Sequence, residues 1–312
     1  MSFKVISIGE LLVEIMRDEV GIPLNVPGRF LGPFPSGAPG IFINCIAKLG
    51  IPCSFVGTVG DDGFGELILN RFKESGVDTS NIRISEEHTT GVAFIAYRRD
   101  GNREFVFHFD KAASGNIRES QVRHEIFKGV EWLHITGSTI TANEMCRQSG
   151  YKAVQIAKSE GASVCFDPNI RPELVDIDRI QAICDPVLKR ADLLMPSAKE
   201  ACLLAGIERE EEACLELKKR GAKAVVLKRG AQGCRIYIDD KIIDVPSFEV
   251  DEIDPTGAGD SFDAGFVYGM IQGWDWEKCG KFANGIGALS VMKFGPMEGA
   301  PTLKEALEFT GI

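Results

Sequence analysis

The sequence contains no CxxC pair, although it has nine cysteines. The cysteines are scattered along the chain, and several lie in apolar runs such as the one from Ser163 to Phe166. This distribution is typical of buried free thiols in a reducing compartment. We therefore expect a cytoplasmic protein.

The sequence also has no block of basic residues. Its 45 acidic residues outweigh its 35 basic residues, and the formal net charge is -10. Nucleic acid and anionic membrane surfaces are therefore not expected as partners. No apolar segment is long enough to span a bilayer, and the first residues lack the length and cleavage pattern of a signal peptide. Chain length and composition are those of a globular protein with a large core.

Several well-known catalytic motifs are missing as well. The sequence has no GxxxxGK(S/T) phosphate loop, no HRD or DFG of protein kinases, no HExxH and no GxSxG. These absences argue against P-loop kinases, protein kinases, and the zinc proteases and hydrolases that carry those motifs.

The second half of the sequence alternates between segments typical of strands and segments typical of helices. We predict strands at 130–136, 163–166, 192–195 and 224–228, and helices at 142–159, 177–190 and 199–204. Further strands are predicted at 3–8 and 53–57, and further helices at 41–49 and 66–75. Such alternation indicates βαβ units, and hence a single α/β domain over 1–312 with a mainly parallel central sheet flanked by helices.

A predicted β-hairpin interrupts this pattern. Residues 90–97 and 103–109 are rich in β-branched and aromatic residues, and the turn 99–102 separates them. A hairpin inserted into βαβ units suggests a small sheet that lies over the main site. Such a sheet would act as a lid that excludes water during a reaction.

The clearest chemical signal is the run DPTGAGD from Asp254 to Asp260. Apolar residues follow it at the spacing of a buried helix, so the run is predicted to be a loop that opens a helix. The N–H groups of such a helix start, made accessible by Gly257 and Gly259, form a cradle for a phosphate or an oxyanion. Asp260 beside this cradle can accept a proton from a hydroxyl, as phosphoryl transfer requires. The alternative is an ordinary acidic helix cap.

Other polar residues lie where predicted parallel strands end. Glu10 and Glu14 follow the first strand, and Asn169 and Arg171 follow the strand at 163–166. Ligands bind beyond the carboxyl ends of the strands in such sheets, so these side chains are candidates to face a substrate or a phosphate. Solvated charges and loop hydrogen bonds are the alternative interpretation.

Two runs resemble the signatures of the ribokinase-like (PfkB) family of carbohydrate kinases. DPTGAGD with the following SFDAGF resembles the C-terminal signature, and SGAP with the helix that ends before Gly50 resembles the N-terminal signature. The resemblance extends from Gly9 to about Pro301. It implies a ribokinase-like fold, with a small β-sheet lid formed by about 11–35 and 89–112 and a homodimer contact through that lid.

The resemblance implies a role for each member of the DPTGAGD turn and for several residues around it. Asp260 is the implied catalytic base, and the amides of Gly257, Ala258 and Gly259 are the implied anion hole. The implied substrate-binding residues are Glu14, Gly37, Asn44, His108, Arg171 and Asp260. For His108, packing within the lid is the alternative.

The same resemblance implies binding sites for ATP, Mg²⁺ and K⁺. The implied nucleotide-binding residues are Lys228, Gly230, Gly233, Gly257, Gly259 and Asn284. Glu200 is expected to act on Mg²⁺ through water, because this ion tends to keep several of its waters. A first-turn helix carboxylate is the alternative for Glu200. Asp254 and the loop 293–301 are the implied site for a monovalent cation.

Three positions depart from the family's pattern, and they bear on the substrate. Ser36 replaces a glycine, Ile41 replaces an asparagine that usually contacts the sugar, and Ser197 replaces another asparagine. The motif sequences of this chain resemble most those of family branches that phosphorylate ketohexoses such as tagatose or fructose. We therefore expect ATP-dependent phosphorylation of a primary hydroxyl of such a sugar. A 2-keto-3-deoxygluconate kinase is one alternative and a nucleoside kinase another. A sugar- or nucleotide-binding protein that has lost catalysis is the alternative from a different class.

Overall fold

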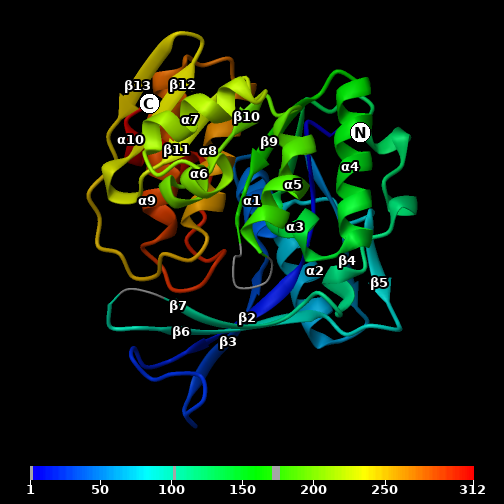
Figure 1. Cartoon of the computed structure of the whole chain (residues 1–312). Helices are drawn as coiled ribbons and strands as arrows, with labels where there is room; N and C mark the ends of the chain where they lie inside the picture. Colours follow the sequence, from blue (N-terminus) through cyan, green and yellow to red (C-terminus); the bar gives the residue numbers. More distant parts are fainter. Residues whose placement is uncertain (1–2, 101–102, 171–175) are drawn as a thin grey trace.

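The computed structural model describes residues 3–100, 103–170 and 176–312. Over these residues the strands form two separate sheets, one of nine strands and one of four. Figure 1 shows the larger sheet surrounded by helices and the smaller sheet apart from them, at the lower edge of the view. Within the same residues, no helix combines the length and the apolar character needed to cross a membrane.

The larger sheet is parallel through its first seven strands in chain order. Its spatial order is β13-β12-β11-β10-β9-β8-β1-β4-β5, and among the described strands the antiparallel pairings of this sheet are β11 with β12 and β12 with β13. The strands are β1 (Val5–Ile8), β4 (Cys53–Gly60), β5 (Ile82–Ser85), β8 (Trp132–Thr136), β9 (Ser163–Asp167), β10 (Leu193–Leu194), β11 (Ala224–Lys228), β12 (Cys234–Ile238) and β13 (Lys241–Val245).

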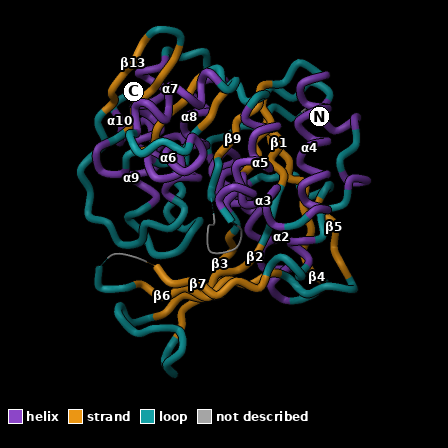
Figure 2. The backbone as a smooth tube through the Cα atoms, viewed as in Figure 1, coloured by secondary structure: helices purple, strands orange, loops and turns teal. Residues whose placement is uncertain are grey.

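Helices cover both faces of this sheet (Figure 2). Side chains alternate along each strand, so in β1 Val5 packs into one core and Ile6 into the other. The core that contains Val5 is covered by α1 (Ala38–Lys48), α2 (Gly63–Ser75), α8 (Ala258–Ile271), α9 (Trp276–Ser290) and α10 (Leu303–Thr310). The core that contains Ile6 is covered by α3 (Gly137–Ala142), α4 (Glu144–Ser159), α5 (Ile177–Leu188), α6 (Ala198–Ala205) and α7 (Glu210–Lys219).

Helix α8 is buried along most of its length, as its composition of small and apolar residues requires. It packs closely on α9, where a Cβ at Gly265 would lie 2.9 Å from the Cα of Ala283. It also packs against α1. The start of α8 is therefore held in place from several sides, which fixes the position of the DPTGAGD turn.

The small sheet consists of β2 (Leu12–Arg17), β3 (Phe30–Ser36), β6 (Gly91–Tyr97) and β7 (Arg103–His108), in the order β3-β2-β6-β7. Strands β2 and β6 pair parallel, whereas the two outer pairings are antiparallel. Strand β3 contains two prolines and lies at an edge, where a residue without an N–H donor is tolerated. The predicted α/β fold with a mainly parallel sheet and a separate small sheet is confirmed, although the sequence patterns had assigned no strands to 12–17 and 30–36.

Candidate active site

The DPTGAGD run forms the turn that opens α8, with Gly257 as the cap residue. Gly257 has φ 80° and ψ 1°, a left-handed conformation that favours glycine. A Cβ on this residue would lie 2.6 Å from the carbonyl oxygen of Pro296. No side chain of the described residues caps this helix. The first-turn amides of the helix therefore face the site as a cradle for an anion.

Asp260 lies in the first turn of α8 and is 8% exposed. The side-chain amide of Asn169, which follows β9, lies 3.5 Å from its Oδ1. Asn169 has φ 37°, an uncommon conformation that asparagine tolerates better than most residues other than glycine. The amide thus orients the carboxylate that the sequence predicted as the catalytic base.

A buried charged cluster includes Asp263, which follows Asp260 by one turn of α8. The Lys228 ammonium, at the end of β11, is 3.1 Å from Oδ2 of Asp167 and 3.1 Å from Oδ1 of Asp263. These side chains are 13%, 3% and 0% exposed, in the same order. Asp167 also accepts a hydrogen bond from the backbone N–H of Asn169 at 3.1 Å. The cluster therefore links the ends of β9 and β11 to the first turns of α8, next to the cradle.

The surroundings shift the pKa values of the three groups of this cluster in different ways. Burial raises the pKa of the Asp263 carboxyl well above its ordinary value, and this outweighs the opposing effect of Lys228. Burial acts in the same sense on Asp167, but the Lys228 ammonium and a hydrogen bond from Asp263 hold the pKa of that carboxyl below its usual range. Burial lowers the pKa of Lys228, whereas the neighbouring carboxylates raise it, and the net result is a raised pKa. Within the cluster the Lys228–Asp167 ion pair is therefore favoured, whereas burial disfavours the charged form of Asp263.

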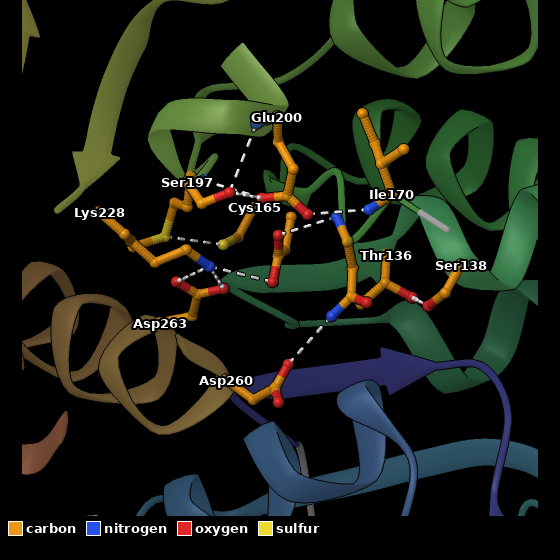
Figure 3. Close-up of polar contacts among 12 residues, drawn as sticks. Thr136, Ser138, Cys165, Ile170, Ser197, Glu200, Lys228, Asp260 and Asp263 are labelled. Carbon is orange, nitrogen blue, oxygen red and sulfur yellow. Dashed lines mark hydrogen bonds and ion pairs between the residues drawn. The ribbon is translucent and has the colours of Figure 1, made fainter. Parts of the chain in front are cut away.

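Glu200 occupies the first turn of α6 and is fully engaged by protein donors. Its Oε2 accepts from the N–H and hydroxyl of Ser197 at 2.8 and 2.7 Å, and its Oε1 accepts from the N–H of Ile170 at 2.8 Å (Figure 3). Ser197 and Glu200 form a capping box for α6. Both interpretations given to Glu200 remain compatible with this geometry, because each carboxylate oxygen can accept more than one bond.

A cavity of about 530 Å³ opens beside the cradle. It is lined from β11 and the following turn, from the first turn of α8 and from α9, and its walls include Lys228, Gly230, Gly233, Gly259 and Asn284. The structure thus brings five of the six predicted nucleotide-binding residues to one cavity. The sixth, the cap residue Gly257, lies two positions before Gly259 on the adjoining turn.

Asn284 and Lys228 each have a structural role in addition to lining the cavity. The Asn284 amide donates to the backbone oxygens of Val245 and Pro246 at 3.1 and 3.0 Å, so it fastens α9 to the end of β13. A Cβ built on Gly259 would lie 3.4 Å from the Lys228 ammonium, which places this cation against the backbone of the cradle.

Two of the predicted substrate residues, Gly37 and Glu14, lie near the N-terminus of α1, which is close to the cradle. Gly37 caps α1, and Glu14 of β2 accepts a hydrogen bond from the hydroxyl of Ser36 at 2.8 Å. Ile41, in the first turns of α1, would lie 3.1 Å from a Cβ on Gly257. Two of the departures from the family's pattern lie in this region: Ser36 holds the Glu14 carboxylate, and Ile41 presents an apolar surface beside the cradle.

Other predicted substrate residues do not lie at the N-terminus of α1. Asn44 is fully buried in α1 and accepts a hydrogen bond from Ser75 of α2, so its side chain stabilises the packing of two helices. His108 is exposed at the end of β7, where its ring packs edge-on against Phe94 with centroids 6.4 Å apart. Arg171 lies outside the described residues.

Asp254, the predicted ligand for a monovalent cation, is 1% exposed. Its Oδ2 accepts from the N–H of Gly295 at 2.9 Å, and its Oδ1 accepts from the N–H of Thr256 at 3.0 Å. The carboxylate therefore lies against the 293–301 loop, as the resemblance implies. It also accepts a hydrogen bond from Tyr97 of the small sheet at 2.7 Å.

Sequence reasoning missed Asp263, Asp167 and Tyr97 as parts of the site. Asp263 carried one signal, because a carboxylate one turn after Asp260 on a helix of apolar residues is unusual unless it has a partner. Asp167 is 61 positions from Lys228 along the chain, and Tyr97 is 157 positions from Asp254. No local pattern reveals contacts over such separations.

Comparison with known proteins adds to this geometry. The sequence matches the family model described as pfkB family carbohydrate kinase over residues 3–303. It is 32% identical over 321 residues to a protein named probable fructokinase-2 from Arabidopsis thaliana, and the match covers 99% of this chain and 96% of the relative.

Solved structures with similar folds include proteins with bound nucleotide. One is an E. coli protein provisionally named ribokinase II, in complex with ATP and Mg²⁺, with a TM-score of 0.93, 39% identity and coverage of 100% of this chain and 99% of the other. Another is a fructokinase double mutant from Vibrio cholerae O395 in its fructose-, ADP- and potassium-bound form. Its TM-score is 0.87 at 28% identity, with 99% of both chains covered.

Proposed function

The chain belongs to the pfkB family of carbohydrate kinases, and from this premise we propose that it transfers the γ-phosphoryl group of ATP to a primary hydroxyl of fructose or a closely related ketohexose. The observation that carries the proposal is the position of Asp260, in the first turn of α8 between the anion cradle and the N-terminus of α1. The fructokinase names of the relatives support a ketohexose as the acceptor.

Each part of the site has a distinct role in this reaction. The nucleotide lies in the cavity beside α9, with its phosphates toward Gly257, Ala258 and Gly259. The sugar lies toward Glu14 and Gly37. Asp260 accepts the proton of the attacking hydroxyl, while the cradle amides stabilise the negative charge of the transferring group. The Lys228 ammonium behind Gly259 adds positive charge to the same place.

The residues present fit bound Mg²⁺ and a monovalent cation. Mg²⁺ commonly binds substrate phosphates and waters with few protein ligands, and it neutralises phosphate charge when bound. Glu200 would hold such waters, because each of its carboxylate oxygens can accept a further hydrogen bond. Asp254, whose carboxylate lies against the loop at Gly295, would supply an oxygen ligand for K⁺. The ATP, Mg²⁺ and potassium in the similar structures support these assignments.

The alternatives are less well supported. The relatives carry fructokinase names, so 2-keto-3-deoxygluconate is not favoured as the substrate. The presence of Asp260 and an intact cradle argues against a binding protein that has lost catalysis. The nine cysteines are free thiols and eight of them are buried, which supports our proposal that the protein works in the reducing cytoplasm.

A substrate panel tests the proposed function. We expect ADP release with Mg-ATP to be fastest, by kcat/KM, with fructose or tagatose when these are compared with ribose, 2-keto-3-deoxygluconate and adenosine. Preference for the keto acid or for adenosine would replace the proposed substrate class. A thermal shift with sugars but no ADP release from any of them would favour the binding protein instead.

We also propose that two copies of the chain pair through their small sheets. The support is apolar surface on the outer strands: Phe30 and Leu31 of β3 are each 39% exposed, and Val106 of β7 is 41% exposed. We expect light scattering to give the mass of two chains, and Val106→Asp to shift the protein toward the monomer. A monomeric wild type at micromolar concentration would contradict this proposal.

A further inference from the structure

Tyr97 reaches from the small sheet into the DPTGAGD turn. It is the last residue of β6, and its hydroxyl lies 2.7 Å from Oδ1 of Asp254 and 2.9 Å from the hydroxyl of Thr256. Arg103, paired with Tyr97 across the hairpin, lies 3.4 Å from the same threonine hydroxyl. One end of the β6–β7 hairpin therefore contacts the residues that immediately precede the cradle.

The acceptor of this contact is a buried carboxylate at a fixed position. Asp254 is 1% exposed and Thr256 is 5% exposed. Besides Tyr97, the N–H groups of Thr256 and Gly295 donate to Asp254. Thr256 is followed directly by Gly257, whose left-handed conformation opens α8. A change in the position of Asp254 would therefore displace the cradle amides.

Tyr97 acts as a donor across the working range of pH. Burial raises the pKa of its phenol above the ordinary value, the Thr256 hydroxyl opposes this rise in part, and the Asp254 carboxylate raises the pKa further. Hydrogen bonds to a charged acceptor are stronger than those between neutral groups, and burial protects this one from competing water.

The other end of this connection lies at the proposed sugar site. Strand β2 carries Glu14, and β2 pairs with β6 so that Glu14 lies opposite Ala93. A continuous path of backbone pairing thus leads from Glu14 through β6 to Tyr97, and from there through Asp254 to the cradle. A ligand that fixes the small sheet at Glu14 therefore also fixes the hydroxyl that holds the phosphate-binding turn.

We propose that Tyr97 is a positioning residue that couples the small sheet to the phosphate cradle, so that sugar bound at Glu14 strengthens nucleotide binding at Gly257–Gly259. This proposal rests on the proposed function for the identity of the two ligands. The coupling is reciprocal, because a free energy shared between two sites raises both affinities by the same factor.

The coupling is tested with Tyr97→Phe, which removes the hydroxyl and keeps the ring. Tyr151→Phe is a matched control, because the Tyr151 hydroxyl also donates one hydrogen bond, to the carbonyl oxygen of Ile183 at 2.7 Å, in a helix on the other face of the sheet. Calorimetry gives the Kd of Mg-AMP-PNP with and without saturating fructose. The coupling is the Kd without fructose divided by the Kd with fructose. We expect this ratio to fall about tenfold in Tyr97→Phe, as loss of one charged hydrogen bond predicts, and to be unchanged in Tyr151→Phe. An unchanged ratio in Tyr97→Phe overturns the proposal.

A second measurement needs no ligand and so separates this inference from the proposed function. Amide hydrogen exchange of the free protein reports on the N–H groups of Thr256 and Gly295, which both donate to Asp254. We expect exchange at these two amides to become about tenfold faster in Tyr97→Phe than in wild type or Tyr151→Phe. Equal exchange in all three proteins overturns the role of Tyr97. A wild type that phosphorylates no sugar contradicts the proposed function instead, and the exchange result still decides whether Tyr97 holds the turn.

Discussion

Asp260→Asn is expected to lower kcat by about 100-fold or more while the affinity for ATP changes little, because the variant loses a general base and keeps the shape of the site. Asn169 lies 3.5 Å from Oδ1 of Asp260, and an asparagine oxygen at that position still accepts from it. The cradle amides belong to the backbone and are unaffected. The measurements are kcat for fructose phosphorylation and the Kd of Mg-AMP-PNP.

Asp263→Asn is the matched control for this experiment. It makes the same substitution in the same helix, one turn further on, at a fully buried position. Burial disfavours the charged form of Asp263, so a neutral amide is a small change at this position, and we expect kcat to stay within about threefold of the wild type. Wild-type turnover in Asp260→Asn would contradict the role of this residue as the base. Equal losses in both variants would show that the effect comes from disturbing α8.

The parts of the fold that were predictable are those with a local signal. Strands at 163–166 and 224–228 are short apolar runs between helical segments, and the structure has β9 and β11 there. Strands β2 and β3 were missed because Glu14 and two prolines break the usual strand pattern. Strand β2 pairs with β6, a partner about 80 residues away along the chain, and β3 pairs in turn with β2, so neither strand is stabilised by a local pattern alone.

The site likewise has some features with a local sequence signal and others without one. The cradle and Asp260 lie within one short run, so their proximity followed from the sequence alone. The capping box of Ser197 and Glu200 was also readable, since S-x-x-E at a helix start has a known geometry. Burial was not readable: Asn44 lies one turn after Ile41 on the same face of α1, and only the packing of α2 against that face shows that its amide is inaccessible.

The Lys228 cluster shows why long-range contacts escape sequence reasoning. A lysine at the end of a strand before a glycine turn looks like a phosphate ligand. The structure adds two carboxyl partners, Asp167 from β9 and Asp263 from α8, and so shows that the cation is held from behind while it lines the cavity. Its charge therefore serves the stability of the protein as well as the nucleotide site.

Lys228→Met is accordingly expected to lower the free energy of unfolding by about 3–5 kcal/mol, because it leaves the Asp167 carboxylate buried without its cation. Methionine has nearly the shape of the lysine stem, so little of the loss comes from packing. Asp263→Asn is expected to cost less, about 1 kcal/mol, since burial already disfavours the charged form of Asp263 and the amide oxygen can still accept from the Lys228 ammonium. Urea unfolding at neutral pH, without ligand, measures both values.

The double variant Lys228→Met/Asp167→Asn distinguishes charge from shape. If the cost of Lys228→Met comes from an unpaired buried carboxylate, removing that charge as well should recover about half or more of the lost stability. Simple addition of the two single costs would mean that the pair does not interact in the folded protein. Recovery of stability without recovery of kcat would show that the Lys228 ammonium has a second role at the cradle, because the backbone of Gly259 that it lies against is intact in the double variant.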